Sequence, residues 1–117
     1  MRVSLFVLSL LVLFVASSSS LAFAEDYEIA IPSGASDPNA QFFWSEKSTG
    51  VTTGEITVFP GDSVTWSNGD SALHTITSVS QSGTVDGVFD SGVFTVGKSH
   101  TQQFDELGDF YYFCVLH

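Results

Sequence analysis

The sequence contains very little cysteine or methionine. Among its 117 residues there is one cysteine, Cys114, and one methionine, Met1. A single cysteine excludes an internal disulfide, so a cross-link of this kind cannot stabilise the fold. A free thiol is readily oxidised outside the cytoplasm, and a bound metal ion or a second chain would explain why one is present.

Positive charge is also scarce. The chain has three lysine and arginine residues against 13 acidic residues, which gives a formal net charge of −10. This balance argues against binding to nucleic acids or anionic membranes, and it favours solubility and cationic partners. The acidic residues are scattered along the chain, so most of them are expected to form an ordinary solvated surface.

No helical periodicity of apolar residues is present after Ala24. Short segments of alternating polar and apolar residues are instead separated by turn sequences rich in glycine, proline and asparagine. We predict strands at residues 27–31, 55–59, 63–67, 73–79, 99–104 and 109–113, with a further candidate at 41–44. Residues 83–90, which are interrupted by glycine, are predicted to be irregular. Roughly seven short strands at this spacing predict one all-β domain, a sandwich or barrel.

The N-terminal residues 1–24 have the composition of a secretory signal peptide. Arg2 precedes an apolar run, and the segment ends in a small-x-small pattern before the acidic Glu25. The apolar run is shorter than the ~20 residues of a membrane-spanning helix. We therefore predict that residues 1–24 are removed and that residues 25–117 form an exported domain, in the periplasm, at the cell surface or secreted. A retained membrane anchor is the alternative.

Four side chains are candidates for transition-metal binding near neutral pH: Cys114, His74, His100 and His117. Cys114 and His117 follow the last predicted strand, and His74 follows the turn at residues 68–70. A β-sandwich can bring such distant segments together at one end. One thiolate and two imidazoles match the trigonal ligand set of blue-copper sites, although the same ligands can also hold zinc with a water molecule. His100 lies in a polar segment and is predicted to be exposed.

Several spaced motifs occur in the second half of the sequence. They are Pro60-Gly61-Asp62-Ser63-Val64-Thr65-Trp66-Ser67-Asn68, His74-Thr75-Ile76-Thr77-Ser78, Phe89-Asp90-Ser91-Gly92, the single residues Gly97 and Phe104, and Gly108-x-Phe110-x-Tyr112-x-Cys114-x-x-His117. In content and order this series, which covers residues 54–117, resembles the plastocyanin-like cupredoxins, a family of small blue copper proteins. Residues 25–53 fit the same fold but carry no signature.

The resemblance implies a cupredoxin-like Greek-key β-sandwich in which His74, Cys114 and His117 bind one type 1 copper ion. Members of the family usually add a methionine ligand a few residues after the second histidine, followed by a last strand. The chain has no methionine after Met1. We therefore expect residues 25–117 to be a cupredoxin domain that is incomplete at its C-terminus, without the axial ligand and the last strand.

The resemblance also implies roles for residues around these ligands. The backbone amide of Thr75 would point toward the thiolate, and Asn68 would hold the ligand loop or only form its turn. Phe113 would be an aromatic residue linked to electron transfer, although ordinary packing also explains it. From the alternation of the last strand, Phe110 and Tyr112 are predicted to point into the core.

The predicted function is one-electron transfer between larger redox proteins, without enzymatic activity. The partners would be redox proteins with cationic or apolar docking surfaces, and neither nucleic acid nor a small-molecule substrate is expected. Two alternatives remain: a copper carrier or storage protein on the same fold, and a metal-free recognition domain. A catalytic role within a nitrite reductase or multicopper oxidase is disfavoured, because those enzymes need further histidines and only His100 is left.

Overall fold

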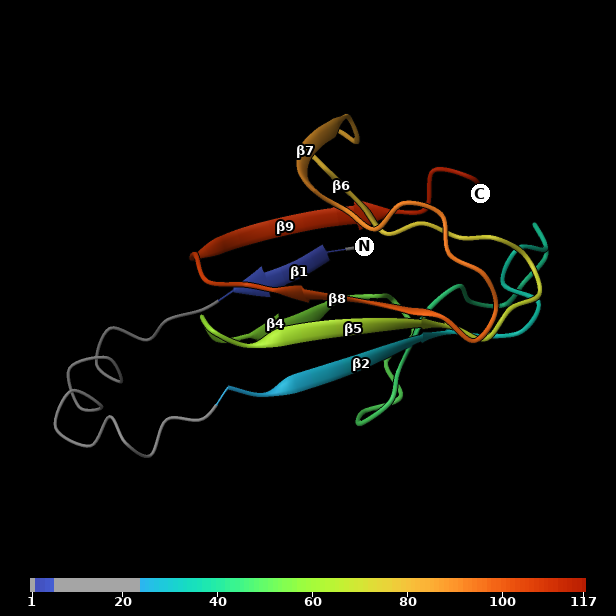
Figure 1. Cartoon of the computed structure of the whole chain (residues 1–117), viewed down its shortest axis with the longest axis horizontal. Helices are drawn as coiled ribbons and strands as arrows, with labels where there is room; N and C mark the ends of the chain where they lie inside the picture. Colours follow the sequence, from blue (N-terminus) through green and yellow to red (C-terminus); the bar gives the residue numbers. More distant parts are fainter. Residues whose placement is uncertain (1, 6–23) are drawn as a thin grey trace, which may run out of the picture.

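The computed structural model describes residues 2–5 and 24–117 (Figure 1). In this part of the chain the backbone forms nine strands and no helix, which confirms the prediction of an all-β fold. The strands are β1 (Arg2–Leu5), β2 (Asp26–Ile31), β3 (Ser45–Glu46), β4 (Ile56–Val58), β5 (Ser63–Asn68), β6 (Thr77–Val79), β7 (Val85–Asp90), β8 (Ser99–Gln103) and β9 (Gly108–Phe113).

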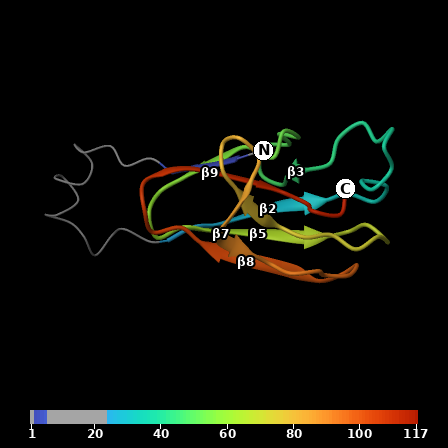
Figure 2. The same cartoon turned by 90° about the horizontal axis from the view of Figure 1, so that it is seen from above.

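The strands form two sheets that face each other across the core. One sheet has the order β4-β1-β9-β6-β7, and the other has the order β3-β2-β5-β8. Figure 2 shows β2, β5 and β8 side by side, with β2 parallel to β5 and β5 antiparallel to β8. In the opposite sheet, β9 lies between β1 and β6 and is antiparallel to both. The predicted β-sandwich is therefore confirmed.

The core between the sheets is built around aromatic side chains. Trp66 and Tyr112 come from opposite sheets, and their rings meet edge to face with centroids 5.0 Å apart. Strand β5 alternates between half-buried and buried residues, which places Val64 and Trp66 in the core. Tyr112 is buried and Phe110 packs against the same cluster, so the predicted orientation of the last strand is confirmed. Each such side chain contributes roughly 1.5–3 kcal/mol by leaving water.

Strand β7 differs from the prediction, which made residues 83–90 irregular. Val85–Asp90 pairs antiparallel with β6, although the register shifts along the pair. Gly87, inside the strand, has a φ of 75°, a conformation that glycine adopts more readily than other residues. The glycine pattern therefore marks an irregular strand and not a loop.

The predicted strand at residues 73–79 is shorter in the structure, where β6 begins at Thr77. Before it, His74 and Phe94 form an isolated bridge. The backbone amides of Thr75 and Ile76 donate to side chains instead of to a neighbouring strand. These bonds interrupt the sheet at the place where His74 is held.

Part of the predicted signal peptide belongs to the described structure. Arg2–Leu5 forms β1, which pairs with β4 and β9, and Val3 is fully buried. Residues 1 and 6–23 lie outside the described residues, so cleavage after residue 24 stays a prediction. Such cleavage would remove β1 and open the facing edges of β4 and β9 to another strand. Within residues 2–5 and 24–117, no helix is long and apolar enough to cross a membrane.

A substitution of Tyr112 tests the hydrogen bond that links β9 to the loop before β4. The Tyr112 hydroxyl donates to the carbonyl oxygen of Gly54 at 2.6 Å, and burial raises the pKa of Tyr112 well above its ordinary value. Tyr112→Phe would leave this carbonyl without its donor, so we expect a loss of about 1–2 kcal/mol in the free energy of unfolding. Urea denaturation measures the loss. Tyr111→Phe, on the opposite face of β9, is the control, and an equal effect in both variants would contradict the role of the bond.

Candidate metal centre

The antiparallel pairing of β6 and β9 brings two distant segments of the chain together. Thr77 lies opposite Phe113, so the residues before β6 run beside the residues after β9. Two hydrogen bonds continue this contact. The Thr75 amide donates to Cys114 Sγ at 3.3 Å, and the Val115 amide donates to Thr75 Oγ1 at 3.0 Å. The predicted direction of the Thr75 amide is confirmed.

Three potential metal ligands meet at this end of the sandwich. One ligand atom from each of His74, Cys114 and His117 lies within 4.8 Å of the other two. The distance from Cys114 Sγ to His74 Nδ1 is 3.7 Å. His74 and Cys114 are buried, whereas His117 is exposed. The three residues selected from the sequence therefore lie together, and one of them is open to solvent.

The hydrogen bonds of the two imidazoles determine which ring nitrogen carries a proton and which can bind a metal ion. His74 Nε2 lies 2.8 Å from Asp70 Oδ2, and His117 Nε2 lies 3.0 Å from the carbonyl oxygen of Leu73. An ionised carboxylate and a carbonyl only accept hydrogen bonds, so Nε2 carries the proton in both rings. The Nδ1 lone pairs of His74 and His117 are then free to bind a metal ion.

Asp70 is a buried acid that holds the first of these rings. Its Oδ1 accepts from the Gly34 amide at 3.0 Å, and its Oδ2 accepts from the Ser36 amide at 3.1 Å as well as from His74. Burial would raise the pKa of Asp70, but the hydrogen bonds from His74, Gly34 and Ser36 outweigh burial and hold the pKa well below its ordinary value. The side chain beside His74 is therefore a carboxylate.

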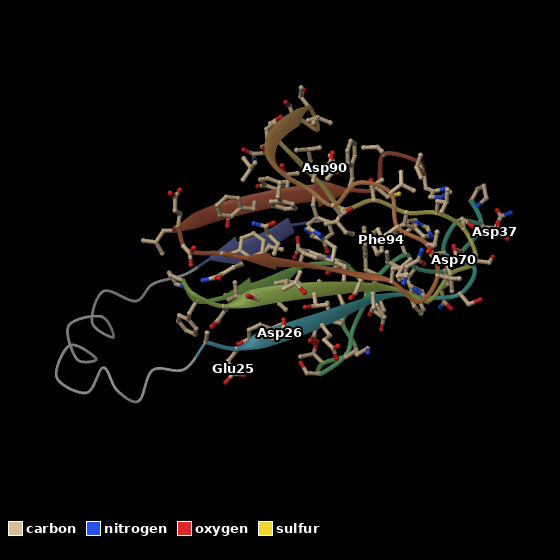
Figure 3. All side chains as sticks on the ribbon, in the orientation of Figure 1. Glu25, Asp26, Asp37, Asp70, Asp90 and Phe94 are labelled. Carbon is tan, nitrogen blue, oxygen red and sulfur yellow. The ribbon has the colours of Figure 1, made fainter. Side chains whose placement is uncertain are left out.

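Asn68 fixes the loop that carries Asp70. Its Nδ2 donates to the carbonyl oxygens of Ala72 and Phe94, and its Oδ1 accepts from the Asp70 amide at 2.8 Å. Of the two roles considered for Asn68, holding the ligand loop is the one observed. Figure 3, in the orientation of Figure 1, shows Asp70 toward the end of the sandwich where the C-terminus lies.

The donor atoms of the cluster suit copper. The thiolate of Cys114 is a soft ligand that favours Cu(I), and imidazole nitrogens bind both Cu(I) and Cu(II). The Thr75 amide satisfies part of the thiolate's hydrogen-bonding capacity inside the protein. The same donors also bind zinc, so the chemistry of the cluster alone leaves these two metals open.

Comparison with known proteins identifies the fold around the cluster. No family model and no curated protein sequence matches the chain. A solved structure does match: the novel purple cupredoxin from Nitrosopumilus maritimus, with 30% sequence identity and a TM-score of 0.63. The match covers 77% of this chain and 87% of that chain. The chain belongs to the cupredoxin family.

The methionine ligand and the last strand expected after His117 stay predictions, and Met1 lies outside the described residues. Phe113 is half-buried at the end of β9, directly before Cys114. Its link to electron transfer also stays a prediction.

Two residues near the ligands were missed by the sequence analysis. The ring of Phe43 meets His74 edge to face at 5.2 Å and lies 6.3 Å from the ring of His117. Phe43 and His117 also line an open hollow of about 360 Å³. Asp70 was assigned only to a turn, although its spacing of four positions from His74 was an available signal. Phe43 lies in the apolar segment 41–44, and an apolar pattern does not reveal that one of its residues contacts a metal-binding histidine.

His100 lies outside the cluster of ligands, in agreement with the prediction. The prediction that it is exposed was wrong, because the residue is half-buried. Its ring stacks on Trp66 with centroids 6.5 Å apart and an angle of 25° between the planes. Its Nε2 is buried and has no hydrogen-bond partner within the described part of the chain. Burial lowers the pKa of His100 below its ordinary value of 6.5, against the opposing effects of Gln102 and Asp90.

This lowered pKa predicts a pH dependence of stability. The unfolded chain binds a proton at His100 more readily than the folded chain does. Protonation of His100 therefore does not affect the free energy of unfolding well above pH 6.5. It lowers this free energy as the pH falls from 6.5 through the lower pKa of the folded state. We expect His100→Gln to lose less stability than the wild type over this interval. Urea denaturation of the metal-free proteins across a pH series measures the difference. A difference between the two proteins that does not change with pH would show that burial of His100 leaves its titration unaffected.

Proposed function

We propose that this cupredoxin binds one type 1 copper ion through His74, Cys114 and His117 and carries single electrons between redox proteins. The main support is the 3.7 Å distance from the buried Cys114 Sγ to His74 Nδ1, with His117 completing the cluster at the surface. A copper ion held there would supply a one-electron couple between Cu(I) and Cu(II). In this proposal the protein is a carrier and not an enzyme.

The protein's part is to keep the ligands in place when the charge of the centre changes. Cys114 directly follows β9 and is held by the Thr75 amide. His74 is held through its ring by Asp70 and through its backbone by Phe94. Ligands that the fold already holds in position need little rearrangement when an electron arrives or leaves, which favours rapid transfer.

In this proposal electrons enter and leave through His117, the exposed ligand. Three exposed apolar side chains lie near His117. They are Leu73, whose carbonyl oxygen accepts from the His117 ring, and Val115 and Leu116, which precede His117 in the chain. Apolar surface of this kind releases water when a partner docks. The proposed partners are redox proteins with an apolar surface, or with a cationic surface that complements the 13 acidic residues.

Export is a second part of the proposal. Residues 1–24 match the pattern of a secretory signal peptide. A lone thiol such as Cys114 is compatible with an oxidising compartment when a metal ion holds it. The protein would act in the periplasm, at the cell surface or after secretion.

Copper loading of the purified protein tests the proposed centre. We expect one Cu(II) ion per chain by elemental analysis and an intense visible band from thiolate-to-Cu(II) charge transfer. Cys114→Ser should abolish the band, whereas His100→Gln should keep it because His100 lies outside the cluster. The resemblance to plastocyanin-like proteins favours a blue colour, but the similar solved structure is named a purple cupredoxin, so the whole visible range is recorded.

The possible outcomes separate the alternatives. A colourless Cu(II)-loaded protein, or a band that persists in Cys114→Ser, would falsify the type 1 copper site. Tight Cu(I) binding without reversible redox cycling would favour a copper carrier or storage protein. Purified protein that contains zinc would favour a zinc site, and protein that binds no metal would favour a recognition domain.

The proposed docking surface predicts an effect on electron self-exchange between the Cu(I) and Cu(II) forms. Leu116→Asp adds a charge to the apolar surface beside His117, so we expect exchange to slow by roughly tenfold, as measured by NMR line broadening. Leu107→Asp is the matched control. Leu107 is also an exposed leucine, but it lies directly before β9, at the strand end opposite Cys114. Equal slowing in both variants would reflect net charge alone and contradict docking at His117.

A further inference from the structure

We propose that Asp70 is a positioning residue of the centre, which holds His74 with Nδ1 toward Cys114 and favours the oxidised metal through its negative charge. This role rests on the proposed function. It adds to the centre a residue that does not itself bind the metal.

The contact between Asp70 and His74 sets the proton position of the ring. Asp70 Oδ2 lies 2.8 Å from His74 Nε2, and the two residues are 2% and 0% exposed. Such burial shields the pair from bulk water, and a carboxylate only accepts hydrogen bonds. The proton therefore stays on Nε2, which leaves the Nδ1 lone pair on the side of Cys114.

Asp70 is itself fixed from a segment far away in the sequence. The Gly34 amide donates to Oδ1 at 3.0 Å, and the Ser36 amide donates to Oδ2 at 3.1 Å. Both carboxylate oxygens are thus held by backbone groups, which allow less movement than flexible side chains. The carboxylate links the loop at residues 34–36 to the ring of His74.

The backbone of His74 belongs to the same network. Asn68 Oδ1 accepts from the Asp70 amide, and Asn68 Nδ2 donates to the carbonyl oxygen of Phe94. Phe94 exchanges two backbone hydrogen bonds with His74, at 3.2 and 3.0 Å. Side chain and main chain of His74 are therefore held through one set of contacts, in which Asp70 bonds to Nε2 of the ring while Nδ1 lies 3.7 Å from Cys114 Sγ.

The two imidazoles of the cluster differ in the charge of their partners. His74 donates to the carboxylate of Asp70, whereas His117 donates to the neutral carbonyl of Leu73. A carboxylate partner makes an imidazole a stronger donor to a metal. A buried negative charge also stabilises Cu(II) more than Cu(I), because the interaction grows with the charge of the ion and is weakly screened in the interior.

Two substitutions separate the charge of Asp70 from its position. Asp70→Asn keeps the shape of the side chain but removes its charge. The new amide nitrogen would face hydrogen-bond donors, either the Gly34 amide on one side or the Ser36 amide and the His74 ring on the other. Asp70→Glu keeps the charge but displaces the carboxylate by one methylene group. Asp105→Asn removes one charge from an exposed turn between β8 and β9, where the carboxylate accepts from Gln103, and is the control.

Three measurements on the full chain follow, after circular dichroism has established that each variant is folded. Nitrogen-15 NMR of the metal-free protein should show the His74 proton on Nε2 in the wild type and a mixture of tautomers in Asp70→Asn. Copper affinity should fall roughly 10- to 100-fold in Asp70→Asn. The reduction potential should rise in Asp70→Asn and stay near the wild-type value in Asp70→Glu, which should lose affinity. Asp105→Asn should leave all three quantities unchanged.

The outcomes keep this role distinct from the proposed function. Wild-type tautomer, affinity and potential in Asp70→Asn would overturn the role of Asp70. If that variant does not fold, wild-type affinity and tautomer in Asp70→Glu would overturn it equally. A wild-type protein that binds no copper would overturn the proposed function, while the tautomer measurement, which needs no metal, would still decide whether Asp70 orients His74.

Discussion

The antiparallel pairing of β6 with β9 places Cys114 beside His74, which lies 40 positions earlier in the chain. The sheet ends at this point on one side, because the Thr75 amide donates to the cysteine sulfur and not to a strand. The pairing of Thr77 with Phe113 is therefore followed directly by the contact of the Thr75 amide with Cys114 Sγ. The geometry of the centre depends on this register, since a shift by one residue would turn Cys114 away from the core.

Around this pairing, bonds between side chains and backbone hold the ligands. Asn68, the last residue of β5, fixes the loop that follows it, and Asp70 in that loop holds the His74 imidazole and the distant segment at Gly34. His117, in contrast, is exposed, and its ring donates to the backbone carbonyl of Leu73. The centre thus combines a buried, rigid half with an exposed half, a division that suits the proposed transfer of electrons to a docking partner.

Much of the fold and the ligand cluster follows from the sequence because both depend on local patterns. Alternation places Val64 and Trp66 in the core, and the motif ending in Cys114 and His117 marks the ligand loop. The role of Asp70 depends on amides that lie 36 and 34 positions earlier, and no local pattern encodes such a contact. The half-burial of His100 follows from a ring on the neighbouring strand, which its own polar segment does not reveal.

The most direct test of the account is a crystal structure of the copper-loaded protein with an anomalous difference map at the copper edge. We expect one copper peak per chain, bound by Cys114 Sγ and by the Nδ1 atoms of His74 and His117, with His74 Nε2 still bonded to Asp70. A peak elsewhere on the molecule, or coordination through Nε2 of His74, would contradict it.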